Sequence, residues 1–197
     1  MTHDLAKRNE NAVASPYANP WLEAEAEVGS DLGKILKFVD GVYKVGEDEV
    51  EIGTKFVAQI HQVMRGWVKF ENGKPTEKIL GKLADGFKMP KREELSDVDE
   101  SLWEDNRDPW SEQWYLPLIS ESDELHTFVT ASDGGASAVG ALCGAYGRSD
   151  RTCLPIVALK GGSYMSKKYH KKIHYPEFFV AGWNNPLKDQ MDDEMPF

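Results

Sequence analysis

The chain has 197 residues, of which 41% are hydrophobic and 28% are charged, and its formal net charge is −10. This length suits one domain with extensions, and the composition is that of a globular protein rather than a disordered or fibrous one. No apolar run reaches the length of a membrane span, and Cys143 and Cys153 lack the spacing of a zinc site or a disulfide framework, so we expect a cytoplasmic protein with reduced thiols.

The charge is distributed unevenly along the chain. Residues 33–92 carry 12 basic and 8 acidic side chains, and residues 125–183 carry 7 basic and 3 acidic ones, so both segments are positive. Residues 93–124 carry 12 acids and 1 base, and both ends of the chain are acidic as well. An acidic protein with this asymmetry can still present a basic groove to a nucleic acid.

The first 84 residues predict an arm followed by β-strands. Residues 1–30 show no sustained apolar period, and we expect a mobile N-terminal arm there. Alternating apolar residues and turn dipeptides then indicate a series of short strands at residues 35–39, 42–45, 49–53, 55–63, 65–71 and 76–80. Residues two apart in a strand point to the same side, so Arg65, Trp67 and Lys69 share one face.

Residues 85–113 break this pattern and predict an acidic insert. Short helical turns are expected at residues 93–97 and 101–104. Three tryptophans lie among the acids, which is typical of a loop packed by its own side chains: Trp103, Trp110 and Trp114.

The second half of the chain predicts more strands and one helix. Ser132 or Asp133 can cap a helix over Ala136–Tyr146, whose apolar residues recur at helical spacing. Strands are expected at residues 114–118, 125–130, 155–159 and 178–183, with a basic loop at 163–173 and a flexible acidic tail at 184–197. The sequence thus predicts a mainly β domain over residues 31–183, with one or two helices, which we interpret as an OB-fold-like five-stranded barrel with insertions.

Aromatic and basic residues are interleaved on the predicted strands and in the basic loop. Single-stranded DNA requires both kinds of side chain, because bases stack on rings and phosphates attract lysines. The alternative is that the rings fill the core and the lysines only solubilise the surface. The predicted DNA contacts are Tyr43, Lys44, Arg65, Trp67, Lys69, Tyr164, Lys167, Lys168, Tyr169, Lys171 and Lys172.

Other chemistry-bearing residues give weaker patterns. His170 and His174 have a spacing that can bind zinc on a helix, but no third ligand is evident and lysines surround them. Asp133-Gly134-Gly135 lacks the Lys-Ser/Thr pair of a phosphate-binding loop. We therefore predict no metal, no cofactor and no catalytic residue, and hence a protein that is not an enzyme.

The segment Met191–Phe197 places three acids before Met-Pro-Phe. It has too few apolar residues to fold alone, but a ring and a carboxylate can dock on a partner. It resembles the acidic C-terminal tip of bacterial and phage single-stranded DNA-binding proteins, with matches at Asp192, Asp193, Glu194, Met195, Pro196 and Phe197. The resemblance implies that the tip recruits replication, recombination or repair enzymes in a bacterial or phage-infected cell. It does not extend to the rest of the chain.

The sequence therefore predicts non-catalytic, largely sequence-independent binding of single-stranded DNA, with possible self-association. The competing hypothesis is an acidic interaction protein, for example a DNA mimic that inhibits a nuclease or a host defence factor. The acidic insert favours this alternative, and the two positive segments oppose it.

Overall fold

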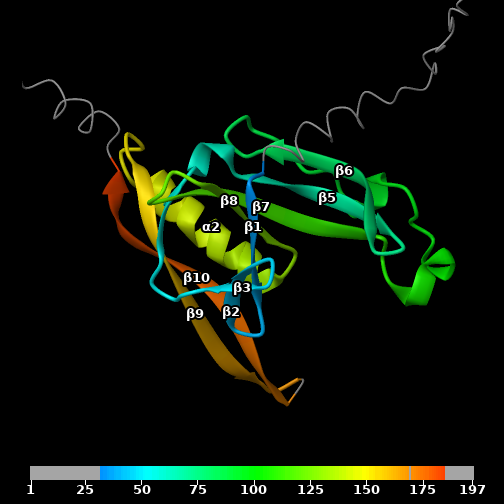
Figure 1. The fold of residues 1–197 in the computed structure, drawn as a ribbon. Helices are drawn as coiled ribbons and strands as arrows, with labels where there is room; N and C mark the ends of the chain where they lie inside the picture. Colours follow the sequence, from blue (N-terminus) through cyan, green and yellow to red (C-terminus); the bar gives the residue numbers. More distant parts are fainter. Residues whose placement is uncertain (1–31, 169, 185–197) are drawn as a thin grey trace, which may run out of the picture. The chain divides into compact units, whose positions relative to one another are not determined.

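The computed structural model describes residues 32–168 and 170–184 of the chain. These residues form ten strands and one α-helix (Figure 1). The strands are β1 (Lys34–Val39), β2 (Val42–Val45), β3 (Asp48–Val50), β4 (Lys55–Ala58), β5 (Met64–Glu71), β6 (Lys74–Lys82), β7 (Trp110–Ser120), β8 (Leu125–Thr130), β9 (Leu154–Ser166) and β10 (Lys171–Asn184). The helix is α2 (Asp133–Arg148). Within the described residues, no helix has the length and apolar character needed to cross a membrane.

The strands form one strongly curled sheet that stays open, in the order β10-β9-β4-β7-β8-β1-β2-β3 (Figure 1). Strand β1 pairs with β8 in parallel, and the other pairings are antiparallel. Strands β4 and β5 follow each other along the same edge of β7, joined through a short 3₁₀ helix, η1 (Ile60–Gln62). The predicted single strand over residues 55–63 is therefore two elements, because the chain bends at η1.

The core lies on one face of this curled sheet and under the helix. Leu36 of β1 and Leu116 of β7 both stand opposite Phe128 of β8, and all three side chains are fully buried. Helix α2 adds Val139 and Leu142 to the same cluster. Each such side chain contributes about 1.5–3 kcal/mol by leaving water, so the apolar stripe of α2 fixes the helix against the sheet.

The predicted helix is confirmed, and its start has a clear physical cause. The Ser132 hydroxyl accepts a hydrogen bond from the Gly135 N–H at 3.1 Å, which satisfies one of the free donors of the first turn. Gly135 leaves room for β8, since a Cβ atom there would lie only 2.0 Å from Thr130 Oγ1. Of the two predicted caps, Ser132 is the N-cap and Asp133 is the first residue of the helix.

The structure changes the predicted fold in two respects. The fold is mainly β with one helix, as expected. However, the ten strands form an open half-barrel, whereas we expected a closed barrel of five strands. The half-barrel includes the first hairpin, because β1 pairs with β8 and extends the sheet. The predicted basic loop at residues 163–173 is the end of a long hairpin, in which Tyr164 stands opposite Ile173 and residues 167, 168 and 170 lie in the turn.

Candidate nucleic-acid interface

The β9–β10 hairpin holds the largest group of predicted contact residues. Its two strands are paired along their whole length. Leu154 stands opposite Asn184 at one end, and Ser166 stands opposite Lys171 at the other. Residues 154–184 carry five lysines and one glutamate, so the hairpin is strongly positive within a protein of net charge −10. Tyr164 is 56% exposed near its tip, and its ring centroid lies 6.1 Å from that of Tyr175. Exposed rings beside lysines are the combination that binds unpaired bases and phosphates.

The lysines of this hairpin lie at and around its turn. Their side chains are exposed: Lys167, Lys168, Lys171 and Lys172. Tyr169, the remaining residue predicted here, lies outside the described residues. The strands thus bring Tyr164 and the four lysines together at the end of one hairpin, as the sequence pattern predicted, although the backbone there is largely strand.

The second predicted cluster, on β5, has different surroundings. Arg65, Trp67 and Lys69 do share one face of the strand, where they stand opposite Trp114, Glu112 and Trp110 of β7, respectively. The segment between β6 and β7, residues 83–109, folds back against this face, and we call it the insert. Phe87 of the insert packs on Gly81, the residue opposite Arg65.

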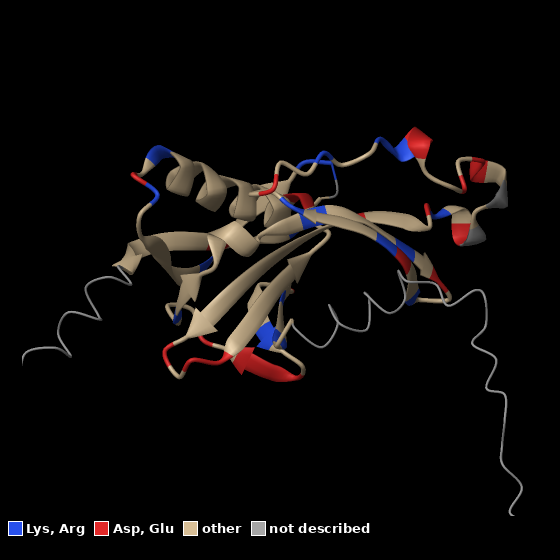
Figure 2. Ribbon diagram, turned by 90° about the horizontal axis from the view of Figure 1, so that it is seen from above, with Lys and Arg blue, Asp and Glu red and all other residues tan. Residues whose placement is uncertain are grey.

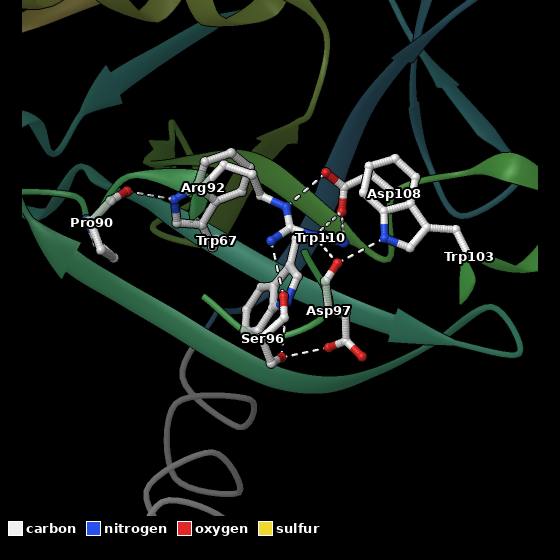
Figure 3. A network of polar contacts seen from close by, with 8 residues as sticks. All are labelled: Trp67, Pro90, Arg92, Ser96, Asp97, Trp103, Asp108 and Trp110. Atoms are coloured by element: carbon white, nitrogen blue, oxygen red, sulfur yellow. Dashed lines mark hydrogen bonds and ion pairs between the residues drawn. The ribbon is translucent and has the colours of Figure 1, made fainter. Parts of the chain in front are cut away.

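The insert contacts Trp67 and Lys69 of this cluster differently. The Trp67 indole N–H donates a hydrogen bond to the Pro90 carbonyl at 2.9 Å (Figure 3). Lys69 Nζ lies 2.8 Å from Glu71 Oε1 and 3.1 Å from Asp97 Oδ2, and its side chain is only 17% exposed. Arg65 stacks over the Trp114 ring at 5.2 Å. Lys69 is thus paired with two carboxylates and Arg65 lies against a ring, so this face is a weaker candidate for binding phosphates than the hairpin.

A single arginine organises the insert (Figure 3). The Arg92 guanidinium donates from Nε and Nη2 to both carboxylate oxygens of Asp108, at 2.7 and 2.8 Å. It also donates to the carbonyls of Ser96 and Asp97 and lies 5.7 Å from the centre of the Trp103 ring. A planar guanidinium suits this arrangement because its donors form a fixed fork.

Two of the three predicted tryptophans pack the insert. The Trp103 indole N–H donates to the Asp97 carbonyl at 2.7 Å, and Trp110, at the start of β7, is buried with its N–H 3.3 Å from Ser96 Oγ. Trp114 instead belongs to β7 and contacts Arg65. The helical turns of the insert are the 3₁₀ helices η2 (Arg92–Glu94), η3 (Glu100–Leu102) and η4 (Glu104–Asn106), and Figure 2 shows acidic residues on all of them.

The electrostatics of the insert follow from these contacts. Hydrogen bonds from Ser96 and then Lys69 hold the pKa of the Asp97 carboxyl below its usual value. Partial burial opposes ionisation of Asp108. The hydrogen bonds from Arg92 and from the backbone N–H of Trp110 outweigh this effect and lower the pKa of that carboxyl too. The hydrogen bond to Glu71, followed by that to Asp97, raises the pKa of the Lys69 amine. All three groups are therefore charged at neutral pH.

Tyr43 is a correction to the predicted contacts. Its side chain is fully buried, and its hydroxyl donates to the carbonyls of Lys160 and Glu177 at 2.9 and 3.1 Å. Burial raises the pKa of this hydroxyl well above its usual value. A ring without exposed surface cannot stack on a base, so Tyr43 ties β2 to the β9–β10 hairpin instead. The neighbouring Lys44 lies on β2, with Nζ 4.0 Å from Glu49 Oε1.

The structure adds two residues that the sequence pattern did not single out. Phe179 of β10 is 52% exposed, and the Lys160 Nζ of β9 lies 4.0 Å from the centre of its ring. The sequence pattern predicted a strand over residues 178–183 but no contact residue within it. Strict alternation along β10 could have separated Phe178, which packs against the core, from Phe179.

The remaining predicted site residues can be placed briefly. The predicted partner-binding residues, Asp192–Phe197, lie outside the described residues. His170 lies in the turn of the hairpin and His174 in β10, so the two do not share a helix. In the described part of the chain, no three His, Cys, Asp or Glu side chains gather as a metal site would require, and both cysteines are unpaired.

The chain was compared with protein families, curated proteins and solved structures. No family model, no curated protein and no solved structure matches the chain.

Proposed function

We propose that this protein is a non-catalytic single-stranded DNA-binding protein that contacts DNA through its β9–β10 hairpin. The observation that carries the proposal is the hairpin end, where the half-exposed ring of Tyr164 and four exposed lysines lie within a few residues of the turn. Rings stack on bases of any identity, and lysines neutralise phosphates, so binding of this kind has little sequence preference. Stacking requires unpaired bases, which favours single strands over duplex.

The chain order of the sheet supports an OB-like interpretation of this domain. If β4 and β5 are counted as one bent strand, and β1–β3 and β6 as additions to the sheet, the remaining strands are β7, β8, β9 and β10, with α2 between the third and the fourth of the five. This is the helix position of an OB-fold. The β9–β10 turn then corresponds to the loop between the fourth and fifth strands, which contacts oligonucleotides in OB-folds.

The acidic regions of the chain are compatible with this function. The insert carries nine acids and four bases, and several of its carboxylates pair with Arg92 and Lys69. Repulsion between the remaining acids and phosphates restricts DNA to the positive hairpin. We further propose that Asp192–Phe197 recruit replication, recombination or repair enzymes, on the strength of their resemblance to the tips of single-stranded DNA-binding proteins.

Binding of the full-length protein to fluorescent oligo-dT, measured by anisotropy at several salt concentrations, tests the proposal. We expect oligo-dT to bind more tightly than a duplex of equal length, with an affinity that falls steeply as salt increases. Equal affinities for the two DNAs, or no binding to oligo-dT at low salt, would contradict it.

The acidic interaction protein is the second candidate function, and the fixed geometry of the insert favours it. Arg92 holds the insert in one conformation through four hydrogen bonds, which an acidic surface that mimics DNA would need. Such a protein would inhibit a DNA-binding enzyme without binding DNA itself. The oligo-dT titration therefore distinguishes the two candidates.

A further inference from the structure

The outer face of the β9–β10 hairpin carries a row of aromatic rings that extends well beyond its basic turn. Directly opposed residues of an antiparallel pair share one face of the sheet. The opposed pairs Tyr164–Ile173, Gly162–Tyr175, Lys160–Glu177 and Ala158–Phe179 succeed one another without a register shift. The three rings of this row, Tyr164, Tyr175 and Phe179, therefore lie along about 20 Å of the hairpin, since a strand rises about 3.3 Å per residue.

Gly162 determines how the rings lie in the part of the row near the turn. A Cβ atom at this position would lie 2.3 Å from Tyr175 Cζ, so the Tyr175 ring lies across the backbone of β9 where a side chain would otherwise stand. This places the Tyr175 ring beside that of Tyr164, with 6.1 Å between their centroids. The glycine thus allows two adjacent rings to share the outer face.

Phe179 forms the other end of the row, and the core does not explain it. Its neighbours Phe178 and Val180 pack against the buried cluster, whereas Phe179 is 52% exposed. Its contact with the Lys160 ammonium at 4.0 Å is a cation–π interaction of an exposed lysine, which is weak and readily exchanged. A large exposed ring next to an exposed cation on a strand is a combination found on surfaces that bind nucleic acids.

The row also forms one wall of a groove of about 890 Å³, a size in the range of pockets that bind ligands. The opposite wall is the start of α2, where small residues leave the space open: Ser137, Ala138 and Ala141. Asp133 and Glu177 also line the groove. These two carboxylates mean that stacking, rather than charge, must provide the attraction along most of its length.

We propose that single-stranded nucleic acid lies lengthwise in this groove, with bases stacked on Tyr164, Tyr175 and Phe179. In the bound state a base replaces the Lys160 ammonium on the Phe179 ring, and Lys160 turns to a phosphate. The inference rests on the proposed function and extends it, since it assigns the path of the strand from the basic turn along β10 and adds Phe179 and Lys160 to the contacts.

The test measures oligo-dT binding by full-length variants at several salt concentrations. Phe179→Ala and Phe179→Leu should each weaken binding about 10-fold, because a stacked base contributes on that scale. The salt dependence should stay unchanged, because no charge is lost. Lys160→Ala should lower the slope of log K against log salt by about 0.7, the value for one phosphate of a single strand. An oligonucleotide of abasic sites should bind wild type and Phe179→Ala equally.

Two control variants make the result specific. Phe179→Tyr retains the ring and should bind like wild type. Val98→Ala removes a 56% exposed apolar side chain from the insert, away from the proposed path of the strand, and should also bind like wild type. Phe179→Leu retains apolar bulk at the site, so a loss of binding shared with Phe179→Ala reports the ring and not misfolding.

Oligo-dT binding by both Phe179→Ala and Phe179→Leu at the wild-type affinity would overturn the inference and assign the groove to another kind of partner. The proposed function would survive that result if the basic turn still contributes to binding. Absence of oligo-dT binding by the wild type would instead remove the proposed function, and the inference with it.

Discussion

The β5 face and the β9–β10 hairpin have similar sequence patterns and different surroundings. Each interleaves rings with basic residues on a strand. On β5, Lys69 lies between two carboxylates and the Trp67 indole N–H is bonded to the insert. On the hairpin, Tyr164 remains 56% exposed and the turn lysines are on the surface. The same pattern thus lies under the insert in one place and at the surface in the other.

This difference originates in residues that are distant in sequence. The carboxylate that neutralises Lys69 belongs to Asp97, and the carbonyl that binds Trp67 belongs to Pro90, both in the insert. The insert packs on β5, whereas the strands of the hairpin are joined by a short turn that includes residues 167, 168 and 170. A local pattern therefore identifies candidate contacts, and the segments packed on it decide which of them are free to bind.

The largest expected effect concerns the stability of the insert. Arg92→Ala removes the fork that joins Asp108, Ser96 and Asp97 and leaves a partly buried carboxylate without its partner, which should cost about 1–3 kcal/mol. Faster cleavage of the insert by a protease, at unchanged oligo-dT affinity, is the expected readout. Arg92→Lys keeps the charge and is the matched control, with partial loss. Wild-type protease resistance in Arg92→Ala would show that Arg92 does not organise the insert.

The next effect is a loss of DNA affinity on changing the lysines of the hairpin turn, which contrasts with the effect expected on the β5 face. Lys167→Ala combined with Lys172→Ala should weaken oligo-dT binding about 10-fold near 0.1 M salt and lower the salt slope by about 1.4, the value for two phosphates of a single strand. Anisotropy titrations over a salt series measure both quantities. If the double variant retains the wild-type slope, the turn does not contact phosphates.

Lys69→Ala is the corresponding change on the β5 face. The oligo-dT affinity should change less than about 2-fold, because Lys69 is already paired with Glu71 and Asp97. The free energy of unfolding, from urea titration, should fall by about 0.5–1 kcal/mol, as for a partly exposed ion pair. A loss of DNA affinity as large as that of the turn variant would place DNA on β5 as well and remove the contrast between the two regions.

The smallest effect is a pH dependence confined to the insert. The pKa values of Asp97 and Asp108 are lowered in the folded protein, so their contribution to stability is present above the unfolded-state pKa near 4 and is lost as pH falls through the folded-state values. Tryptophan fluorescence should therefore report loosening around Trp103 only below about pH 4. Loosening near pH 6 would require a different titrating group.

The sequence predicted the regular parts of the fold well. The helix, its Ser132 cap and most strands were predicted because apolar periodicity and capping are local properties. The half-barrel was missed, because the parallel pairing of β1 with β8 joins residues about 90 positions apart. The hairpin at residues 163–173 was read as a loop, because its lysines obscured the alternation that pairs Tyr164 with Ile173.

The candidate site was predicted in part. Tyr164 and the turn lysines lie together as expected, because they are close in sequence. Tyr43 was misassigned, because burial of its ring depends on β9 and β10. Carbonyls of these two strands accept hydrogen bonds from its hydroxyl. Phe179 was overlooked, because the alternation along β10, in which Phe178 and Val180 face the core and Phe179 faces out, was not applied to this strand.

The most direct test of the central claim is ultraviolet crosslinking of oligo-dT to the full-length protein, with the crosslinked residues identified by mass spectrometry. The account predicts crosslinks within residues 160–184, at Tyr164, Tyr175 or Phe179, and their loss when an excess of unlabelled oligo-dT is added. Crosslinks confined to the β5 face at Trp67 or Trp114, or no crosslink at low salt, would contradict it.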